Sequence, residues 1–301
     1  MQNVEFYDLC LTWYWLYDHD FVHCIEESCA ARGLRLWQIT PGNMLQAVAD
    51  LYQGRAGFGT LLDRAADDQR FEPIRRFALE HGRHRLNPAE QSHWAEDKAT
   101  MHLELLQAGV ETPYTLILAP YISEPVIPAL NLAPLGAKFV LKPAVGGGGE
   151  GVHMNASSME DVLRARLEFP AQKYLVQEQV DAQVLGGTDA WFRVFFVGGL
   201  CIPCWWHPIT HIYRILTPDE EAEFQLDPLR SMTARIARVC RLDWFSTEIA
   251  LTSDGRFVAV DYVNDGIDTR IQSKAADGVP DQVLREMAEQ LVGLVVREAQ
   301  A

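Results

Sequence analysis

The stretch FVLKPAVGGGGEGVHM, residues 139–154, combines residue types that could bind phosphate. An apolar run that favours a β-strand ends at Lys142, and glycines dominate the segment before the next apolar run. Glycines allow backbone N–H groups to approach an anion closely because no Cβ stands in the way. We therefore expect a hairpin loop that folds over a triphosphate, with Lys142 directing a cation at the phosphates. The alternative is a flexible hairpin tip with an incidental lysine.

Two later segments could supply the rest of a nucleotide site. YLVQEQVDA predicts a strand end whose backbone, from Gln177 to Val180, presents amide and carbonyl groups to an adenine edge. Glu178 could accept a hydrogen bond from the exocyclic amine of adenine, and Asp181 is placed for a ribose hydroxyl.

A predicted hairpin carries candidate metal ligands. FSTEIALTSDGRFVAVDYV has Asp254-Gly255 as its turn, which places Glu248 on one strand and Asp261 on the other, with Asn264 just beyond. Carboxylate and amide oxygens are hard ligands that suit Mg²⁺. Taken alone, such a hairpin is also consistent with a solvated polar surface.

The glycine loop does not match the other common nucleotide motifs. It connects two strands, whereas a P-loop or a dinucleotide fingerprint connects a strand to a helix, and the pattern GxxxxGK[ST] is absent from the sequence.

The elements that must position these residues alternate between strand and helix in the first part of the chain. EFYDLCLTWYWL, LRLWQI and GTLLDRA predict strands separated by helices, which is typical of a parallel βαβαβ unit. SHWAEDKATMHLELLQAG then predicts one helix, and residues 119–134 are proline-rich and irregular. KYLVQEQV, AWFRVFFVGG and LCIPCWW predict antiparallel strands, and PDQVLREMAEQLVGLVVREA predicts a helix that ends the chain.

Composition and charge limit the classes of partner. The 301 residues carry a formal net charge of −15, which disfavours nucleic acid and anionic lipid as partners. No apolar run reaches the roughly 18 residues that a membrane span needs, and the first residues do not resemble a secretion signal. Six cysteines do not suggest a disulfide framework, so we expect a cytoplasmic protein.

The segment CIPCWWHPITH offers a rival constellation. Cys201, Cys204, His207 and His211 have spacings that a zinc site could use, but a strand would put the two cysteines on opposite faces. The alternatives are buried cysteines beside an aromatic patch, or a substrate pocket lined by Trp205, Trp206, His207 and His211. Arg64, at the end of a predicted strand, is a further candidate for binding a substrate carboxylate.

Five motifs, in order, resemble those of the ATP-grasp superfamily, and most closely its carboxylate–amine ligases, including the ribosomal-protein glutamate ligases and the glutathione synthetases. The resemblance covers about Leu86 to Ile271. It rests on the segment with the Asp97-Lys98 pair, on FVLKPAVGGGGEGV, on YLVQEQV, on WFRVFFVGG with Arg193, and on STEIAL followed by FVAVDYVND. It implies an α/β (α+β) protein in which a βαβαβ pre-ATP-grasp domain, residues 1–86, precedes an ATP-grasp domain, residues 87–301. The latter would divide into residues 87–180, with the glycine-rich lid, and residues 181–301, with the metal-ligand hairpin.

The resemblance also implies a set of site residues. Those expected to contact ATP are Lys98, Lys142, Gly146, Gly147, Gly148, Gly149, Glu150, Gly151, Gln177, Glu178, Gln179, Val180, Asp181 and Asp189. Those expected to hold Mg²⁺, or Mn²⁺, are Glu248, Asp261 and Asn264, and those expected to neutralise the transferring phosphoryl group are Arg193 and Arg270. The second metal strand departs from the family pattern by one extra residue before the amide, so either Asn264 or Asp265 could complete the metal site. An acid usually found two residues before the arginine is replaced by Trp191, and Asp189 could substitute for it.

The implied activity is ATP-dependent joining of a carboxylate to an amine or thiol through an acyl phosphate, with a small molecule or peptide as substrate. A phosphotransferase of the same fold and a catalytically inactive nucleotide-binding regulatory module are the alternatives. A homodimer is left open, and the sequence does not identify the carboxylate or the acceptor.

Overall fold

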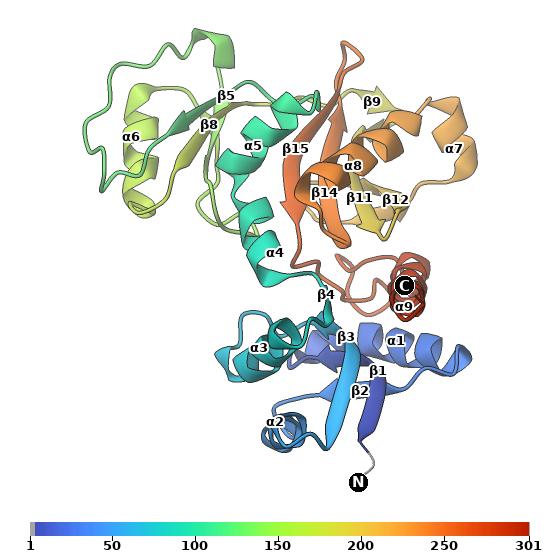
Figure 1. Ribbon diagram of the computed structural model, residues 1–301. Coiled ribbons are helices and arrows are strands. Elements are labelled where there is room, and N and C mark those ends of the chain that lie inside the picture. Colours follow the sequence, from blue (N-terminus) through green and yellow to red (C-terminus); the bar gives the residue numbers. More distant parts are fainter. Residues whose placement is uncertain (1–3, 301) are drawn as a thin grey trace.

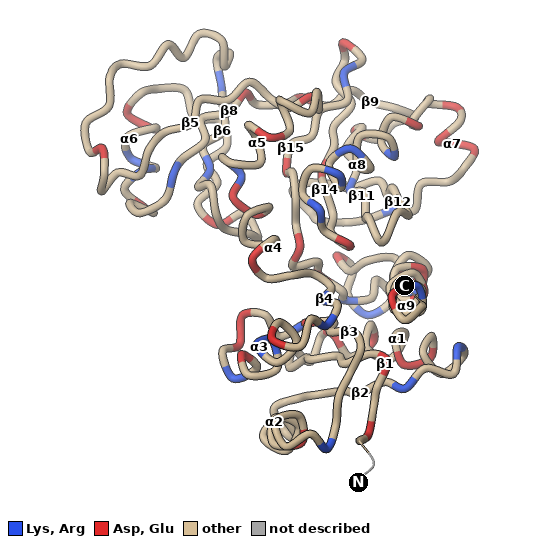
Figure 2. Tube along the Cα trace, viewed as in Figure 1, with Lys and Arg blue, Asp and Glu red and all other residues tan. Residues whose placement is uncertain are grey.

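The structure, a computed structural model, describes residues 4–300, in which three large sheets with their covering helices and one two-stranded sheet are found (Figure 1). A parallel sheet from the start of the chain lies at the bottom of the view, and two antiparallel sheets lie above it. Acidic and basic residues occur in all three parts (Figure 2). No helix in the described part of the chain is both long and apolar enough to cross a membrane.

The first sheet confirms the predicted parallel βαβαβ unit and extends it by one strand. Its order is β2-β1-β3-β4. The strands are β1 (Glu5–Thr12), β2 (Leu36–Ile39), β3 (Ala56–Asp63) and β4 (His84–Leu86), and the helices are α1 (His19–Ala31), α2 (Met44–Tyr52) and α3 (Glu72–Glu80). Most of β3 is buried, as expected for a parallel strand covered by helices on both faces.

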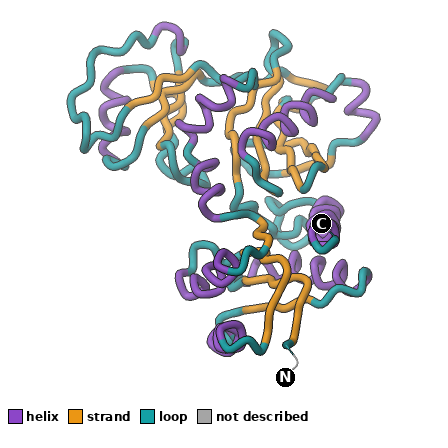
Figure 3. The backbone as a smooth tube through the Cα atoms, in the orientation of Figure 1, coloured by secondary structure: helices purple, strands orange, loops and turns teal. Residues whose placement is uncertain are grey.

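The second sheet carries the glycine loop. Its order is β5-β8-β6-β7, all antiparallel, with strands β5 (Thr115–Leu118), β6 (Phe139–Pro143), β7 (His153–Ala156) and β8 (Tyr174–Glu178). Helix α6 (Met159–Glu168) begins at a capping box formed by Ser158 and Asp161, which satisfies N–H groups of its first turn. The proline-rich stretch 119–134 is mostly loop, as predicted (Figure 3).

The third sheet, of order β13-β12-β11-β14-β15, carries the candidate metal ligands. Its strands are β11 (Trp191–Val197), β12 (Leu200–Trp206), β13 (Tyr213–Ile215), β14 (Trp244–Leu251) and β15 (Phe257–Asn264). Helices α7 (Pro218–Glu223) and α8 (Asp227–Cys240) precede β14, and a hairpin of β9 (Val184–Leu185) and β10 (Thr188–Asp189) precedes β11. Short 3-10 helices are η1 (Leu16–Asp18), η2 (Gln69–Phe71) and η3 (Ala133–Leu135).

The prediction of one continuous helix over SHWAEDKATMHLELLQAG is wrong. Two helices, α4 (Ala89–Glu96) and α5 (Lys98–Gln107), meet at Asp97, whose backbone is extended. The Asp97 carboxylate accepts from the N–H groups of Ala99 and Thr100, so it caps the second helix and ends the first. The break places Lys98 at the first position of α5.

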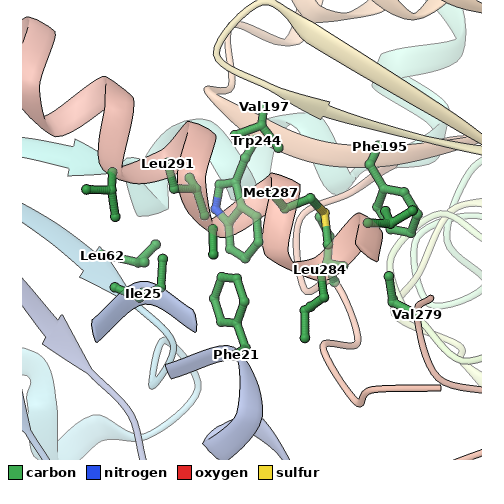
Figure 4. Close-up of a cluster of buried hydrophobic side chains, with 14 of the residues drawn as sticks. Phe21, Ile25, Leu62, Phe195, Val197, Trp244, Val279, Leu284, Met287 and Leu291 are labelled. Atoms are coloured by element: carbon green, nitrogen blue, oxygen red, sulfur yellow. The ribbon is translucent and has the colours of Figure 1, made fainter. Parts of the chain in front are cut away.

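The C-terminal helix α9 (Asp281–Glu298) packs against α1, at the junction of the parallel sheet and the third sheet (Figures 1 and 4). Phe21 of α1 stacks on Trp244 of β14, with ring centroids 5.7 Å apart, and Met287 and Leu291 of α9 belong to the same buried cluster. The domain boundaries at residues 86 and 180 remain predictions.

Candidate active site

Glu248 of β14 lies directly opposite Asp261 of β15. The next pair along the hairpin joins Ser246 to Asn264, so two steps on β14 correspond to three on β15. This β-bulge absorbs the extra residue noted in the sequence, and therefore returns Asn264 to the face of Asp261. The Asn264 amide lies close enough to the Asp261 carboxylate to contribute to lowering its pKa.

Asp265 lies apart from this pair. Its carboxylate accepts from the side-chain amide of Asn87, and it lines a cavity on the other side of the chain segment. Of the two candidates that the sequence left open, Asn264 is the one beside Asp261.

Two lysines from different elements approach the two carboxylates. Lys142, at the end of β6, is 6% exposed and donates to the Val260 carbonyl at 2.9 Å. Lys98 donates to the Gly146 carbonyl at 2.7 Å, and its Nζ lies 3.9 Å from Asp261 Oδ1. Helix α5 and the second sheet thus bring both lysines toward the hairpin that carries the candidate metal ligands.

Arg193 of β11 joins the same cluster. It pairs with Glu248 at 3.2 Å and donates to the Ser246 hydroxyl at 3.0 Å. Its guanidinium also lies over the Trp206 ring, 5.0 Å from the centroid. The structure therefore unites Lys98, Lys142, Arg193, Glu248 and Asp261, which are separated by up to 163 positions in the sequence.

Burial and these cations set the charge states of the cluster. Burial raises the pKa of Glu248, against the lowering effect of Arg193. Burial also acts to raise the pKa of Asp261, but the nearby lysines outweigh it, so that pKa is lowered. The pKa of Lys142 is lowered to about 8, chiefly by burial.

The donor set fits a magnesium ion. Asp261 Oδ1 is buried and accepts no hydrogen bond within residues 4–300, which is costly for a carboxylate oxygen unless a cation completes it. Glu248 and Asn264 lie on the same hairpin and would add further oxygen ligands. When bound, Mg²⁺ would supply charge that stabilises phosphate oxygens.

The glycine loop is an exposed hairpin connection between β6 and β7, as predicted. Gly146, Gly148, Gly149 and Gly151 all have positive φ, which other residues adopt only with strain. A Cβ at Gly151 would also lie 2.6 Å from the Phe169 ring. Gly147 and Glu150 complete the loop, and both are exposed. The Lys98 bond to Gly146 ties one end of this loop to the lysine cluster.

Of the predicted adenine-binding residues, only Gln177 is buried, and the residues from Glu178 onward are more open. Gln177 is buried and donates to Tyr262 and Thr115, so its side chain is occupied, and Glu178 accepts from the Tyr114 N–H. Beyond the strand, Gln179 and Val180 are half-buried and Asp181 is exposed, so their backbone remains the candidate adenine contact.

Sequence reasoning missed a buried network behind this segment. The Tyr262 hydroxyl lies 2.8 Å from His102 Nδ1 and 2.9 Å from Gln177 Nε2, which links β15, α5 and β8. Since Gln177 donates, the Tyr262 hydroxyl can donate to His102. Burial lowers the pKa of His102 to about 4, which keeps its ring neutral. The only signal in the sequence was the aromatic residue that follows Asp261.

Arg270 and Asp189 are not joined to the cluster by any hydrogen bond or ion pair of the described residues. Arg270 forms ion pairs with Asp268 and Asp277, which occupy both edges of its guanidinium and raise its pKa. Asp189 is exposed on the hairpin opposite Val184. The expected roles of Arg270 and Asp189 stay predictions. To bind the transferring phosphoryl group, Arg270 would have to release one of its two carboxylate partners.

The CIPCWWHPITH segment is a regular strand at its start, as predicted. Cys204 packs in the core shared with α9, whereas Cys201 packs in the core under α8, so the two thiols lie on opposite faces of β12. No group of three metal-binding His, Cys, Asp or Glu residues occurs within residues 4–300.

The four proposed pocket residues of this segment do not all face one place. Trp206 stacks on His211 and lies under Arg193. Trp205 faces the α8 core, and His207 accepts from the N–H groups of its own loop. Of the four proposed pocket residues, only Trp206 and His211 lie together near the cluster.

A cavity of about 640 Å³ lies beside the parallel sheet, and none of the five residues of the charged cluster lines it. Its walls come from the carboxyl ends of β3 and β4, from the segment after β1, from α4, and from the segment after β15. Ligands of parallel α/β sheets bind at this edge. Glu96 and Asp265 of its wall lie close in sequence to Lys98 and Asn264, so the cavity and the charged cluster share two chain segments.

Solved structures with the same arrangement of elements are known, although no protein-family model and no curated protein sequence matches the chain. An ATP-grasp RimK domain protein from Sphaerobacter thermophilus is 18% identical with a TM-score of 0.62, covering 94% of this chain and 98% of that one. The ATP-grasp ligase PsnB, complexed with its minimal precursor, Mg and ADP, is 14% identical with a TM-score of 0.64, covering 99% and 100%. The D-alanine–D-alanine ligase of Bacillus anthracis, complexed with ATP, is 14% identical with a TM-score of 0.62, covering 96% and 99%.

This chain has the ATP-grasp fold. The expectation drawn from the five motifs is thereby confirmed for the fold, over nearly the whole chain. The second sheet carries the glycine loop, and the third sheet carries the hairpin with the candidate metal ligands. The βαβαβ unit precedes both, and α9 packs back onto it.

Proposed function

We propose that the protein is an ATP- and magnesium-dependent ligase that joins a carboxylate to an amine through an acyl phosphate. The observation that carries this proposal is the convergence of Lys98, Lys142 and Arg193 on the Glu248–Asp261 pair beneath a glycine-rich loop. Three cations and two carboxylates at one place suit a magnesium-bound triphosphate. The phosphate oxygens would pair with the cations, and the magnesium ion would bind the carboxylates.

Each residue then has a defined task. Lys98 and Lys142 would hold phosphate oxygens, and Arg193 would neutralise charge on the transferring phosphoryl group. Glu248, Asp261 and Asn264 would hold Mg²⁺. The loop from Gly146 to Gly151 would exclude water from an acyl phosphate that hydrolyses readily. No nucleophilic side chain is needed. A substrate carboxylate would attack the γ-phosphate and release ADP, and an amine would then attack the acyl carbon, lose a proton and release inorganic phosphate.

The ligand complexes of the structural neighbours support the choice of cofactors. One PsnB structure contains a minimal precursor, Mg and ADP, another contains the precursor peptide PsnA2 and AMPPNP, and the D-alanine–D-alanine ligase structure contains ATP. The substrate of this protein would accordingly be a small molecule or a peptide terminus.

The test is ADP release from MgATP with pooled carboxylates and amines, in wild type and in Glu248→Gln and Asp261→Asn. Both variants keep the size of the side chain and remove charge from the metal site, so turnover should fall on the order of 100-fold while ATP affinity changes little. Asp254→Asn is the matched control, since it makes the same change at the turn of the same hairpin.

Three outcomes would contradict the proposal. Full turnover of either variant at limiting magnesium would show that the hairpin is not the metal site. ADP release that needs no amine would favour a phosphotransferase. No ADP release with any substrate combination would favour an inactive nucleotide-binding module.

A further inference from the structure

Two buried side chains of the second sheet bond to β15, the strand that carries Asp261. Lys142 of β6 and Gln177 of β8 are 6% and 1% exposed. Lys142 donates to the Val260 carbonyl at 2.9 Å, and Gln177 donates to the Tyr262 hydroxyl at 2.9 Å. The two contacts fall on either side of Asp261, so they hold the second sheet against β15 at the candidate metal site.

A third side-chain contact between the second sheet and the same hairpin is weaker. Arg256, just after the hairpin turn, lies 3.8 Å from Glu178 of β8, and its side chain is 41% exposed. Exposed ion pairs contribute little to stability, because water and salt screen them. The two buried contacts are therefore the ones that can fix the second sheet relative to β15.

The Tyr262 hydroxyl is the centre of a directional chain of hydrogen bonds. Gln177 Nε2 donates to the Thr115 hydroxyl and to the Tyr262 hydroxyl, both at 2.9 Å. The Tyr262 hydroxyl in turn donates to His102 Nδ1 at 2.8 Å, and burial keeps the His102 ring neutral by lowering its pKa to about 4. The chain connects β5, β8, β15 and α5, so one hydroxyl joins both sheets to the helix that carries Lys98.

The bulge in β15 gives Tyr262 this place. It keeps Asp261 and Asn264 on one face while Tyr262 turns into the core, where its side chain is fully buried. The Lys142 Nζ lies 5.4 Å from the centre of the Tyr262 ring. Tyr262 thus contacts the phosphate-binding candidate Lys142 with its ring and the network with its hydroxyl.

We propose that Tyr262 is a positioning residue for the nucleotide, whose hydroxyl holds the second sheet at the spacing that lets Lys142 and the carboxylates of β14 and β15 act on one triphosphate. The proposal rests on the proposed function for the identity of the nucleotide. Tyr262 would act through Lys142 and would not itself touch ATP. Without the hydroxyl, a smaller fraction of molecules would have the binding arrangement, and the apparent Kd would rise in proportion.

Calorimetric titration of the full chain with MgATP tests the proposal. Tyr262→Phe keeps the ring and removes only the hydroxyl, and we expect it to raise the Kd for ATP about tenfold. His102→Leu removes the acceptor of that hydroxyl and should have a similar effect. His102→Asn places an amide oxygen near the position of Nδ1 and should restore the Kd to within about threefold of wild type. Thermal melting checks that each variant is folded.

Ile74→Val is the matched control for lost stability. Ile74 is fully buried in the cluster beneath α2 and α3, far from the network, and the change costs stability of the same order as one hydrogen bond. It should leave the Kd for ATP unchanged. A weakening of ATP binding by Ile74→Val equal to that by Tyr262→Phe would reduce Tyr262 to a purely structural role and overturn the proposal.

Other outcomes separate this inference from the proposed function. Equal ATP affinity of wild type and Tyr262→Phe, or a failure of His102→Asn to restore it, would overturn the positioning role alone. ATP binding that depends on Tyr262, in a protein that releases no ADP with any substrate, would support the positioning role and contradict the ligase. A wild-type protein that binds no ATP would contradict both.

Discussion

A buried ammonium such as that of Lys142 is stable only where anions compensate for its lost hydration. Here Asp261 and Glu248 provide that compensation, while the Lys142 Nζ also lies 5.4 Å from the centre of the Tyr262 ring. A bound triphosphate would strengthen the same compensation, so Lys142 is the residue whose loss should be felt first in nucleotide affinity.

Lys142→Ala should therefore weaken ATP binding without unfolding the protein. Loss of one phosphate-pairing cation costs about 1.5–3 kcal/mol, or about 10- to 150-fold in Kd. Calorimetric titration with ATP measures the effect, and thermal melting checks the fold. Lys138→Ala, at an exposed lysine just before the same strand, is the control. An unchanged ATP affinity in a cooperatively melting Lys142→Ala protein would remove Lys142 from the site.

Tyr262 and Tyr174 offer a matched pair of buried tyrosines. Both are at most 1% exposed, but the Tyr262 hydroxyl bonds to His102 and Gln177, whereas the Tyr174 hydroxyl has no partner within residues 4–300. Tyr262→Phe leaves a buried histidine and amide short of a partner and should cost about 1–3 kcal/mol of unfolding free energy. Tyr174→Phe should cost nothing or stabilise the protein slightly. Chemical denaturation measures both, and equal costs would show that the network does not contribute.

At the level of elements, the bulge in β15 explains how an altered motif can keep its geometry. A strand alternates its side chains, so three steps from Asp261 to Asn264 would normally reverse the face. The extra residue is instead absorbed by the register shift opposite β14, and Tyr262 is turned into the core where its hydroxyl is bonded. The departure in sequence is thus matched by a local change in pairing.

The geometry of β12 leads to a prediction about zinc. Cys201 and Cys204 pack into different cores on the two faces of the sheet, so they cannot converge on one ion without breaking the strand. Metal analysis of purified, tag-free protein should find less than one equivalent of zinc, and a chelator should leave the Tm nearly unchanged. One tightly held zinc per chain that Cys204→Ser removes, together with stability, would show that this segment is not the strand described.

At the level of the whole molecule, one buried cluster joins the first and last parts of the chain. It contains residues of β1, α1, β11, β14 and α9, with the Phe21–Trp244 stack near its centre (Figure 4). The cavity lies beside this junction, since Trp244 contributes to its wall. Stability of the junction and shape of the cavity therefore depend on the same packing.

Phe21→Ala should destabilise the whole protein in one transition. Removing a fully buried phenylalanine leaves a cavity and costs about 3–5 kcal/mol. Leu45→Ala, at a leucine that is 80% exposed on α2, is the control and should change stability by no more than about 0.5 kcal/mol. Thermal unfolding followed by calorimetry measures both. An early, separate transition in Phe21→Ala, with the remainder melting as in wild type, would show that the junction does not couple the two parts.

Local signals in the sequence predicted most of the elements and the fold. Alternating apolar patterns predicted the parallel unit and the hairpins, and the segment from Lys142 through the glycines predicted a strand–loop–strand. Both predictions succeeded because these local conformations do not depend on residues distant in the sequence. Local pattern failed at Asp97, where a competing side-chain cap divides one amphipathic run into two helices. The motifs likewise indicated which residues to consider for the site, but not whether they meet.

Only the tertiary structure decided which of those residues meet and which are already partnered. Lys98, Lys142 and Arg193 reach one hairpin from three elements, whereas Arg64 and Arg270 are committed to neighbouring carboxylates. The choice between Asn264 and Asp265 depended on a register shift between β14 and β15. A sequence specifies residue types and local conformation, but the charge balance of a site is a sum over segments that are brought together only by folding.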